Sequence, residues 1–123
     1  MKMVSRSQLL DKLNQWAAGE LSPVEVHDWA AGLHVPGRGD FEDWEGNGRF
    51  SGSKETIEEL YMLDMNLVTS DDVPVFAAFL NTPEGEFEKG YITFISELQK
   101  IDRKAREKTL KDTEPYVRYC RPL

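Results

Sequence analysis

Apolar residues recur every three or four positions along most of this chain, the spacing that forms one face of an α-helix. The clearest pattern runs from Phe87 to Ile101, and a polar helical segment that Asp102 caps follows it. Two helices are expected earlier, over residues 7–18 and 23–35, another over residues 54–68, and a short one over residues 72–81. No segment shows the alternation typical of β-strands. The sequence therefore predicts an all-α fold, a single compact domain of five or six mostly short helices with a long acidic loop.

The first two helices show further detail. Ser22, Pro23 and Glu25 form a capping box with a first-turn proline, and Pro36 ends the same helix because proline cannot continue it. The two helices also share a short repeat, since residues 16–19 and 29–32 both spell Trp-Ala-Ala-Gly. Small residues permit close contact between helices, so the repeat predicts a helical hairpin that closes at the alanines.

The segment over residues 36–52 is the least regular part of the chain. A connection of this length without secondary structure is uncommon in a compact domain and is usually either a functional or a disordered loop. Its aromatic residues, Phe41, Trp44 and Phe50, need apolar partners and therefore favour partial order. The C-terminal stretch from Pro115 to Tyr119 is also aromatic, and we expect it to fold back onto the domain.

Charge is distributed unevenly along the 123 residues, whose formal net charge is −7. Residues 38–88 contain 13 Asp and Glu against three Lys and Arg, a net charge of −10. The segment before them has a net charge of −1, and the segment after them has +4. A negative centre of this kind attracts basic proteins and repels phosphate, so we expect neither nucleic acid nor a membrane as a partner.

Several classes of protein do not fit the sequence. No apolar run approaches the roughly 18 residues of a membrane-spanning helix, and the first residues lack the pattern of a signal peptide. We therefore expect one soluble, cytoplasmic domain over residues 1–123. Cys120 is the only cysteine, which excludes an internal disulfide and a cysteine-rich metal site.

The acidic loop suggests a calcium site at first sight. Asp43, Glu45, Asn47 and Gly48 match the first half of a calcium-binding loop, but Lys54 stands where the bidentate glutamate belongs. We therefore predict no metal ligands in this loop.

The two histidines and Asp64 are the other candidates for metal or acid–base chemistry. His27 and His34 lie two helical turns, or about 10 Å, apart, which is too far for one metal ion. Asp64 interrupts an apolar helix face, so its burial would require a partner such as Arg103 or Arg106. We expect no catalytic residue and no cofactor. The alternative is an enzyme or metal protein built on Asp43, Glu45, Asp64 and His27.

Aromatic side chains among carboxylates indicate protein binding, because aromatic residues anchor interfaces and charges steer a partner toward them. The helix that follows the acidic loop adds glutamates on its polar side. We therefore predict a site for a basic protein partner that comprises Asp40, Phe41, Glu42, Asp43, Trp44, Glu45, Glu55, Glu58 and Glu59.

Four segments in succession carry a likeness to a known class of proteins. They are residues 7–11, which open the first helix, residues 21–26, which open the second, the acidic Asp-Trp loop, and residues 71–74 followed by 79–83. Their order resembles that of small acidic bacterial immunity proteins from contact-dependent growth inhibition and related toxin systems. The resemblance implies a non-enzymatic protein that binds and neutralises a cognate toxin domain, often a basic nuclease, in the cytoplasm. The resemblance does not assign a function to any individual residue. A third alternative is a structural subunit whose apolar helix from Phe87 forms an oligomer interface.

Overall fold

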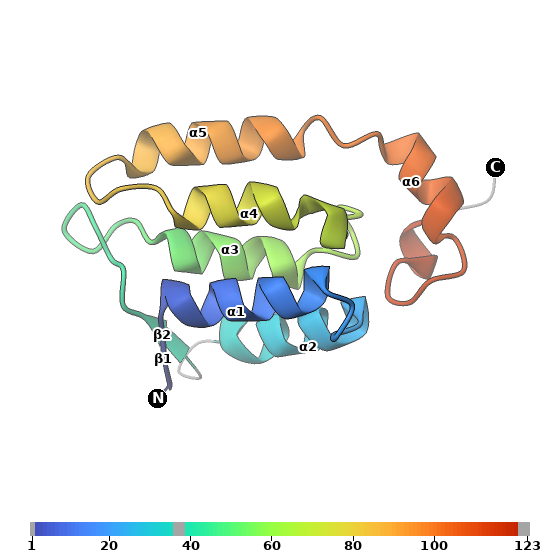
Figure 1. The fold of residues 1–123 in the computed structure, drawn as a ribbon, viewed down its shortest axis with the longest axis horizontal. Coiled ribbons are helices and arrows are strands. Elements are labelled where there is room, and N and C mark those ends of the chain that lie inside the picture. The colour runs from blue at the N-terminus through green and yellow to red at the C-terminus, as the bar shows by residue number, and fades with distance from the viewer. Residues whose placement is uncertain (1, 36–38, 121–123) are drawn as a thin grey trace.

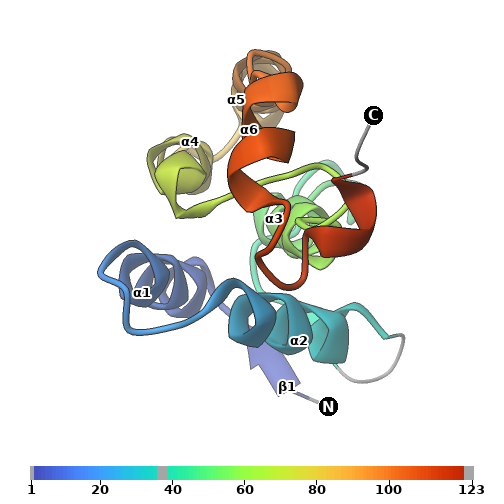
Figure 2. The same ribbon diagram turned by 90° about the vertical axis from the view of Figure 1, so that its right-hand side faces the viewer.

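The computed structural model describes residues 2–35 and 39–120, and it confirms the predicted, mostly helical class. The elements are β1 (Lys2–Val4), α1 (Arg6–Ala17), α2 (Pro23–His34), β2 (Gly39–Phe41), α3 (Gly52–Tyr61), η1 (Ser70–Asp72), α4 (Val73–Leu80), α5 (Phe87–Leu98), α6 (Arg103–Leu110) and η2 (Val117–Tyr119). Helices α1 to α5 lie along the long axis, and the chain reverses direction from each helix to the next (Figure 1). Helix α6 and the C-terminal segment lie across one end of this bundle (Figure 2).

Helices α2 and α6 begin with the caps that their sequences predict. In α2 the backbone N–H of Glu25 donates to Ser22 Oγ at 3.1 Å, and the backbone N–H of Ser22 donates to Glu25 Oε1 at 2.9 Å. Helix α1 begins with the same reciprocal pair between Ser5 and Gln8. Asp102 caps α6 as expected. These side chains satisfy backbone donors that would otherwise lack partners, so each of these helix starts is defined locally.

A single hydrophobic core runs between the helices. The apolar stripe of α5 faces this core, where Phe94 is almost fully buried, while Ile92 on the opposite side is 62% exposed. The stripe therefore packs against the rest of the chain, with Phe94 buried and Phe87, Tyr91, Ile95 and Leu98 partly buried. The largest fully buried side chains are those of Tyr116, Phe76, Phe94, Leu9, Leu13, Ile57, Leu60, Leu63, Leu67 and Leu80.

The C-terminal segment folds back onto the bundle as predicted. Tyr116 has no exposed surface, and its hydroxyl donates a hydrogen bond to the carbonyl of Val68. Arg106 of α6 makes two hydrogen bonds to Asp72, which attach the same end of the chain to η1. The C-terminal segment thus closes the end of the bundle where the turn between α3 and α4 lies (Figure 1).

The expectation that no strands would form was wrong for two short segments. Strands β1 and β2 pair in parallel, with Lys2 opposite Gly39 and Val4 opposite Phe41. Three residues are too few to show an alternating pattern, and the pairing joins segments more than 30 residues apart. Local sequence therefore could not reveal this sheet.

Two predictions about the helices were also wrong. The Trp-Ala-Ala-Gly repeat does not pack as predicted, because Ala30 is buried in the core but Ala17, Ala18 and Gly32 are exposed, so the two copies do not meet at their alanines. The helix expected over residues 54–68 ends at Tyr61, and the chain then turns through Leu67, whose φ of 54° is left-handed. Its later apolar residues are nevertheless buried, since the turn itself packs into the core.

Candidate protein-binding surface

Arg6, the first residue of α1, connects three segments at one end of the bundle. Its Nε lies 2.8 Å from Asp43 Oδ2, and its Nη2 lies 3.7 Å from Glu45 Oε2. Its Nη1 donates to the carbonyls of Leu80 and Thr82, at 2.9 Å and 2.7 Å. One guanidinium therefore joins the acidic loop to the end of α4, which uses the fork-shaped donor geometry of arginine.

The carboxylate of Asp43 is held from several directions. Besides Arg6, it accepts hydrogen bonds from Ser51 Oγ at 2.5 Å and from the backbone N–H of Ser53 at 3.0 Å. Burial alone would raise the pKa of Asp43, but the hydrogen bonds from Ser51, Arg6 and Ser53 together outweigh it and lower that pKa. Asp43 thus stays ionised and fixes the start of α3 to the loop.

The rest of the acidic loop is a tight turn. Glu45 and Phe50 exchange backbone hydrogen bonds, and the intervening Gly46, Asn47 and Gly48 all have positive φ. A Cβ at Gly46 would lie 2.7 Å from the ring of Phe50, so another residue would have to displace that ring, and the φ of 59° at Gly46 also favours glycine. The loop therefore presents its side chains from a defined backbone.

A second loop, between α4 and α5, lies against the first at the same end of the molecule (Figure 1). The backbone N–H of Gly85 donates to Glu45 Oε1 at 2.8 Å, and the ring of Phe50 stacks on that of Phe87 with centroids 5.0 Å apart. Together the two loops enclose a shallow depression of about 230 Å³. Its lining residues are Arg6, Glu42, Asp43, Trp44, Glu45 and Glu84.

We call this surface, with Phe50 and Glu86 at its edge, the acidic end. Glu42, Glu84 and Glu86 are exposed, and Trp44 and Phe50 are 37% and 43% exposed. Two accessible rings thus lie among five carboxylates, those of Glu42, Asp43, Glu45, Glu84 and Glu86. The positive charges at this end are those of Arg6 and the exposed Arg49. A surface of this kind has the charge and the aromatic anchors that suit a basic protein.

The predicted loop residues divide into buried supports and exposed contacts. Phe41 is only 9% exposed and belongs to the core. Asp40 accepts hydrogen bonds from Trp44 Nε1 at 3.1 Å and from the backbone N–H of Phe41 at 2.8 Å. These bonds lower the pKa of Asp40, and the bond from Trp44 has the larger effect. Asp43 and Glu45 face Arg6. Only Glu42 and Trp44 of the six predicted loop residues are exposed.

The three predicted glutamates of α3 form a separate cluster. None of them lines the depression at the acidic end. Burial first, and then repulsion from neighbouring glutamates, raises the pKa of both Glu55 and Glu59. Glu58 instead pairs with Lys54 at 2.8 Å, and the cluster as a whole faces Tyr91, whose pKa is raised by burial and by the glutamate charges.

Replacing Glu59 with glutamine should make the protein more stable at pH 7. A carboxyl whose folded pKa lies above its unfolded value favours folding below the unfolded pKa and loses that contribution as the pH rises through the folded pKa. Glutamine cannot ionise, so the free energy of unfolding of the variant should exceed that of the wild type at pH 7 and match it near pH 4. Urea denaturation at both pH values measures this. Glu20→Gln, in an exposed loop, is the control, and an equal gain there would contradict the explanation.

Asp64 is buried, and neither Arg103 nor Arg106 is its partner. It is 6% exposed, accepts a hydrogen bond from the backbone N–H of Met65, and lies 3.9 Å from His27 Nε2. Arg106 pairs with Asp72 instead, and Arg103 donates to the carbonyl of Met65. Helix α6 docks onto the η1 turn, so its arginines meet the acid that the turn presents.

The residues of the alternative catalytic or metal site lie in two pairs, Asp43 with Glu45 at Arg6 and Asp64 with His27, and they do not form one cluster. Asp43 and Glu45 face a guanidinium, which occupies the position that a cation would need. His27 and His34 both stack on Tyr61, with centroids 5.9 Å and 4.2 Å away. Over residues 2–35 and 39–120, no group of three or more His, Cys, Asp or Glu is arranged to hold a metal ion.

Sequence reasoning missed Arg6, Glu84 and Glu86. Arg6 stands alone in the sequence, 37 residues before Asp43, and nothing local indicates that it is paired. The two glutamates flank Gly85 inside the −10 segment, so their charge was visible although their position was not. Only the contact between the two loops joins them to the predicted site.

Comparison of the chain with protein-family models, with curated proteins and with solved structures found no match. Within the described ranges, no helix is both long enough and apolar enough to cross a membrane. The fold and the acidic end describe this protein as a small, mostly helical domain with a structured acidic surface.

Proposed function

We propose that this chain is a non-enzymatic protein-binding module whose acidic end binds a basic surface on another protein. The observation that carries the proposal is the anchoring by Arg6, which fixes two loops so that their exposed carboxylates and rings share one surface. A mobile acidic loop would have to lose conformational entropy on binding. A surface that is already ordered avoids much of that loss.

The exposed groups match the two parts of such an interaction. Glu42, Glu84 and Glu86 supply negative charge that accelerates and orients the encounter with a basic protein. Trp44 and Phe50 are large, partly exposed rings of the type that contribute most of the affinity at protein interfaces. The same charge repels phosphate, so nucleic acid and anionic membranes are not proposed as partners.

The more specific proposal is that the chain is an immunity protein that neutralises a basic, nuclease-type toxin domain in the cytoplasm. The resemblance of the segment order to bacterial immunity proteins supports it. So does the physical argument that a nuclease must present cations to bind RNA or DNA, and carboxylates can occupy the same groove. This proposal names a toxin domain as the basic partner, and it needs a test of its own.

Charge reversal at the acidic end tests the general proposal. Partners are captured from the native organism with the immobilised wild-type chain, and the affinity of the captured protein is then measured by calorimetry. The double variant Glu42→Lys, Glu84→Lys should bind at least about tenfold more weakly, and wild-type binding should weaken as salt is raised. The matched control is Glu20→Lys, Asp112→Lys, which reverses two exposed acids outside the acidic end.

The outcomes separate the explanations. Equal losses in both double variants would show that only net charge matters, and no loss in the first would exclude the acidic end as the site. For the more specific proposal, the captured partner is expressed in bacteria with and without this chain. Restored growth with the wild type, and not with Glu42→Lys, Glu84→Lys, is expected. A partner that is neither toxic nor a nuclease would contradict the immunity function and leave the binding function standing.

A further inference from the structure

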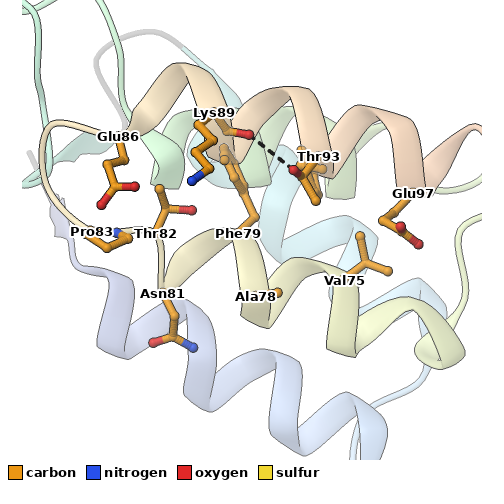
Figure 3. A pocket seen from close by; sticks show the side chains of 12 residues that line it. Val75, Ala78, Phe79, Asn81, Thr82, Pro83, Glu86, Lys89, Thr93 and Glu97 are labelled. Carbon is orange, nitrogen blue, oxygen red and sulfur yellow. Dashed lines mark hydrogen bonds between the residues drawn. The ribbon is translucent and has the colours of Figure 1, made fainter.

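A groove of about 290 Å³ lies between α4 and α5, next to the acidic end (Figure 3). Its volume is just below the roughly 300 Å³ at which pockets for drug-sized ligands begin, so it suits one or two apolar side chains better than a cofactor. Val75, Ala78 and Phe79 line it from α4, and Gly90, Thr93 and Phe94 line it from α5.

The walls of this groove are apolar and firmly held. Phe79 and Phe94 are 3% and 1% exposed and stack with centroids 4.3 Å apart, so their rings belong to the core and only their edges reach the groove. At the loop end, a Cβ on Gly90 would lie 2.3 Å from Thr82 Oγ1. The missing side chain therefore lets α5 approach the loop that follows α4 more closely than another residue would allow.

The groove is continuous with the acidic end through one loop. Thr82, Pro83 and Glu86 line the groove, whereas Glu84 between them lines the acidic depression. Arg6 fixes that loop at the carbonyl of Thr82. An extended or helical segment that entered the groove would therefore place its neighbouring residues over carboxylates.

The other charges along the rim differ in their effect. Glu97, at the far end, already pairs with Lys100 at 2.8 Å. Lys89 lies between Glu86 and Thr93, and its ammonium points across the groove toward Thr82 (Figure 3). Among the described residues that line the groove, Lys89 is the only cation, and it would oppose a basic ligand directly.

We propose that the groove binds an apolar side chain, such as leucine or phenylalanine, from a lysine- or arginine-rich segment of the partner, while the adjacent basic residues contact Glu84 and Glu86. The inference rests on the proposed function, because it names the partner chemistry that this end of the molecule recognises. Negative charge at the loop end and an apolar floor along the helices are the two features that select such a segment.

The test uses the whole chain and a defined peptide. A fluorescein-labelled peptide of two leucines followed by four lysines is titrated by fluorescence anisotropy. Two control peptides carry serine in place of leucine, or glutamate in place of lysine. Ala78→Trp fills the groove from an exposed position on α4, and Ala105→Trp places the same ring on an exposed position of α6 as the matched control.

We expect saturable binding that Ala78→Trp weakens about tenfold and that Ala105→Trp leaves unchanged. Both control peptides should bind the wild-type protein at least about tenfold more weakly than the leucine-lysine peptide does. Lys89→Gln should bind the leucine-lysine peptide several-fold more tightly, since it removes the opposing charge. If circular dichroism shows that Ala78→Trp does not fold, Thr93→Trp fills the same groove from α5.

Three results would overturn the inference: no saturable binding, equal binding of the serine peptide, or unchanged affinity in the folded groove-filling variant. The partner captured with the wild type then separates this inference from the proposed function. If Glu42→Lys, Glu84→Lys weakens that partner and Ala78→Trp does not, the groove inference fails and the binding function stands. If neither variant weakens it, both fail.

Discussion

Replacing Arg6 with methionine should lower the free energy of unfolding by about 3 kcal/mol. Removing one partner of a buried ion pair typically costs about 3–5 kcal/mol, and the Arg6 side chain is 24% exposed, which places the effect at the lower limit. The substitution leaves the carboxylate of Asp43 without its cation and the carbonyls of Leu80 and Thr82 without a donor. Urea denaturation at pH 7 measures the loss.

The control for this substitution is Arg49→Met, which removes an exposed arginine from the acidic loop and should change stability by less than about 0.5 kcal/mol. Combining Arg6→Met with Asp43→Asn should cost less than the sum of the two single changes, because each removes the same contact. A loss below about 1 kcal/mol for Arg6→Met would contradict the role of Arg6 in holding the two loops together.

Arg6→Met also separates organisation from charge at the acidic end. The substitution makes that surface more negative, so charge alone predicts tighter binding of a basic partner. We expect weaker binding, because the loops that carry Glu42 and Glu84 lose their common support. The captured partner used for the charge-reversal test gives this measurement directly.

Replacing Tyr116 with alanine should lower the free energy of unfolding by about 4 kcal/mol. Tyr116 has no exposed surface, and it closes the core at the end of the bundle opposite the acidic end. Alanine would leave a cavity and free the carbonyl of Val68. Burial, and after it the negative charge of Asp72, raises the pKa of Tyr116, so its hydroxyl remains a donor at neutral pH.

Two companion variants divide this loss into its parts. Tyr116→Phe keeps the ring and removes only the hydroxyl, so it should cost about 1–2 kcal/mol. Tyr61→Ala removes a tyrosine that is 39% exposed and should cost clearly less than Tyr116→Ala. Thermal and urea denaturation measure all three. Equal losses for the two alanine variants would mean that the C-terminal segment does not complete the core.

Partner binding gives a further check on Tyr116. The C-terminal segment that contains Tyr116 lies at the opposite end of the bundle from the two loops that Arg6 joins (Figure 1). Folded Tyr116→Phe should therefore keep the wild-type affinity for the captured partner. Arg6→Met should lose affinity even under conditions where it is fully folded. Comparing Arg6→Met with Tyr116→Phe thus distinguishes a general loss of stability from a specific loss of the binding surface.

The sequence predicted the features of this protein that depend on neighbouring residues. The starts of α2 and α6 follow from Ser22, Glu25 and Asp102, because a capping side chain reaches only the next few backbone donors. The buried face of α5 follows from its helical spacing. The acidic character of residues 38–88 is also visible without a structure, since charge is a property of composition.

The same reasoning failed where contacts join distant segments. Strands β1 and β2 are too short to show a pattern, and their pairing depends on how α1 and α2 bring them together. The Trp-Ala-Ala-Gly repeat suggested a helix contact that does not form, because identical short motifs on two helices do not determine which faces meet. Asp64 and Asp72 are both buried acids, and only the docking of α6 decides which of them Arg106 meets.

The binding surface shows the same division most clearly. By itself the sequence determined that a −10 segment contains aromatic residues in an irregular stretch, and that the domain around it is helical. The tertiary structure alone decided that Asp43 and Glu45 turn inward to Arg6, that Glu84 joins Glu42 and Trp44, and that the glutamates of α3 form a separate cluster. Local propensity acts over a few residues, whereas the guanidinium of Arg6 donates a hydrogen bond to the carbonyl of Leu80, more than 70 residues further along the chain.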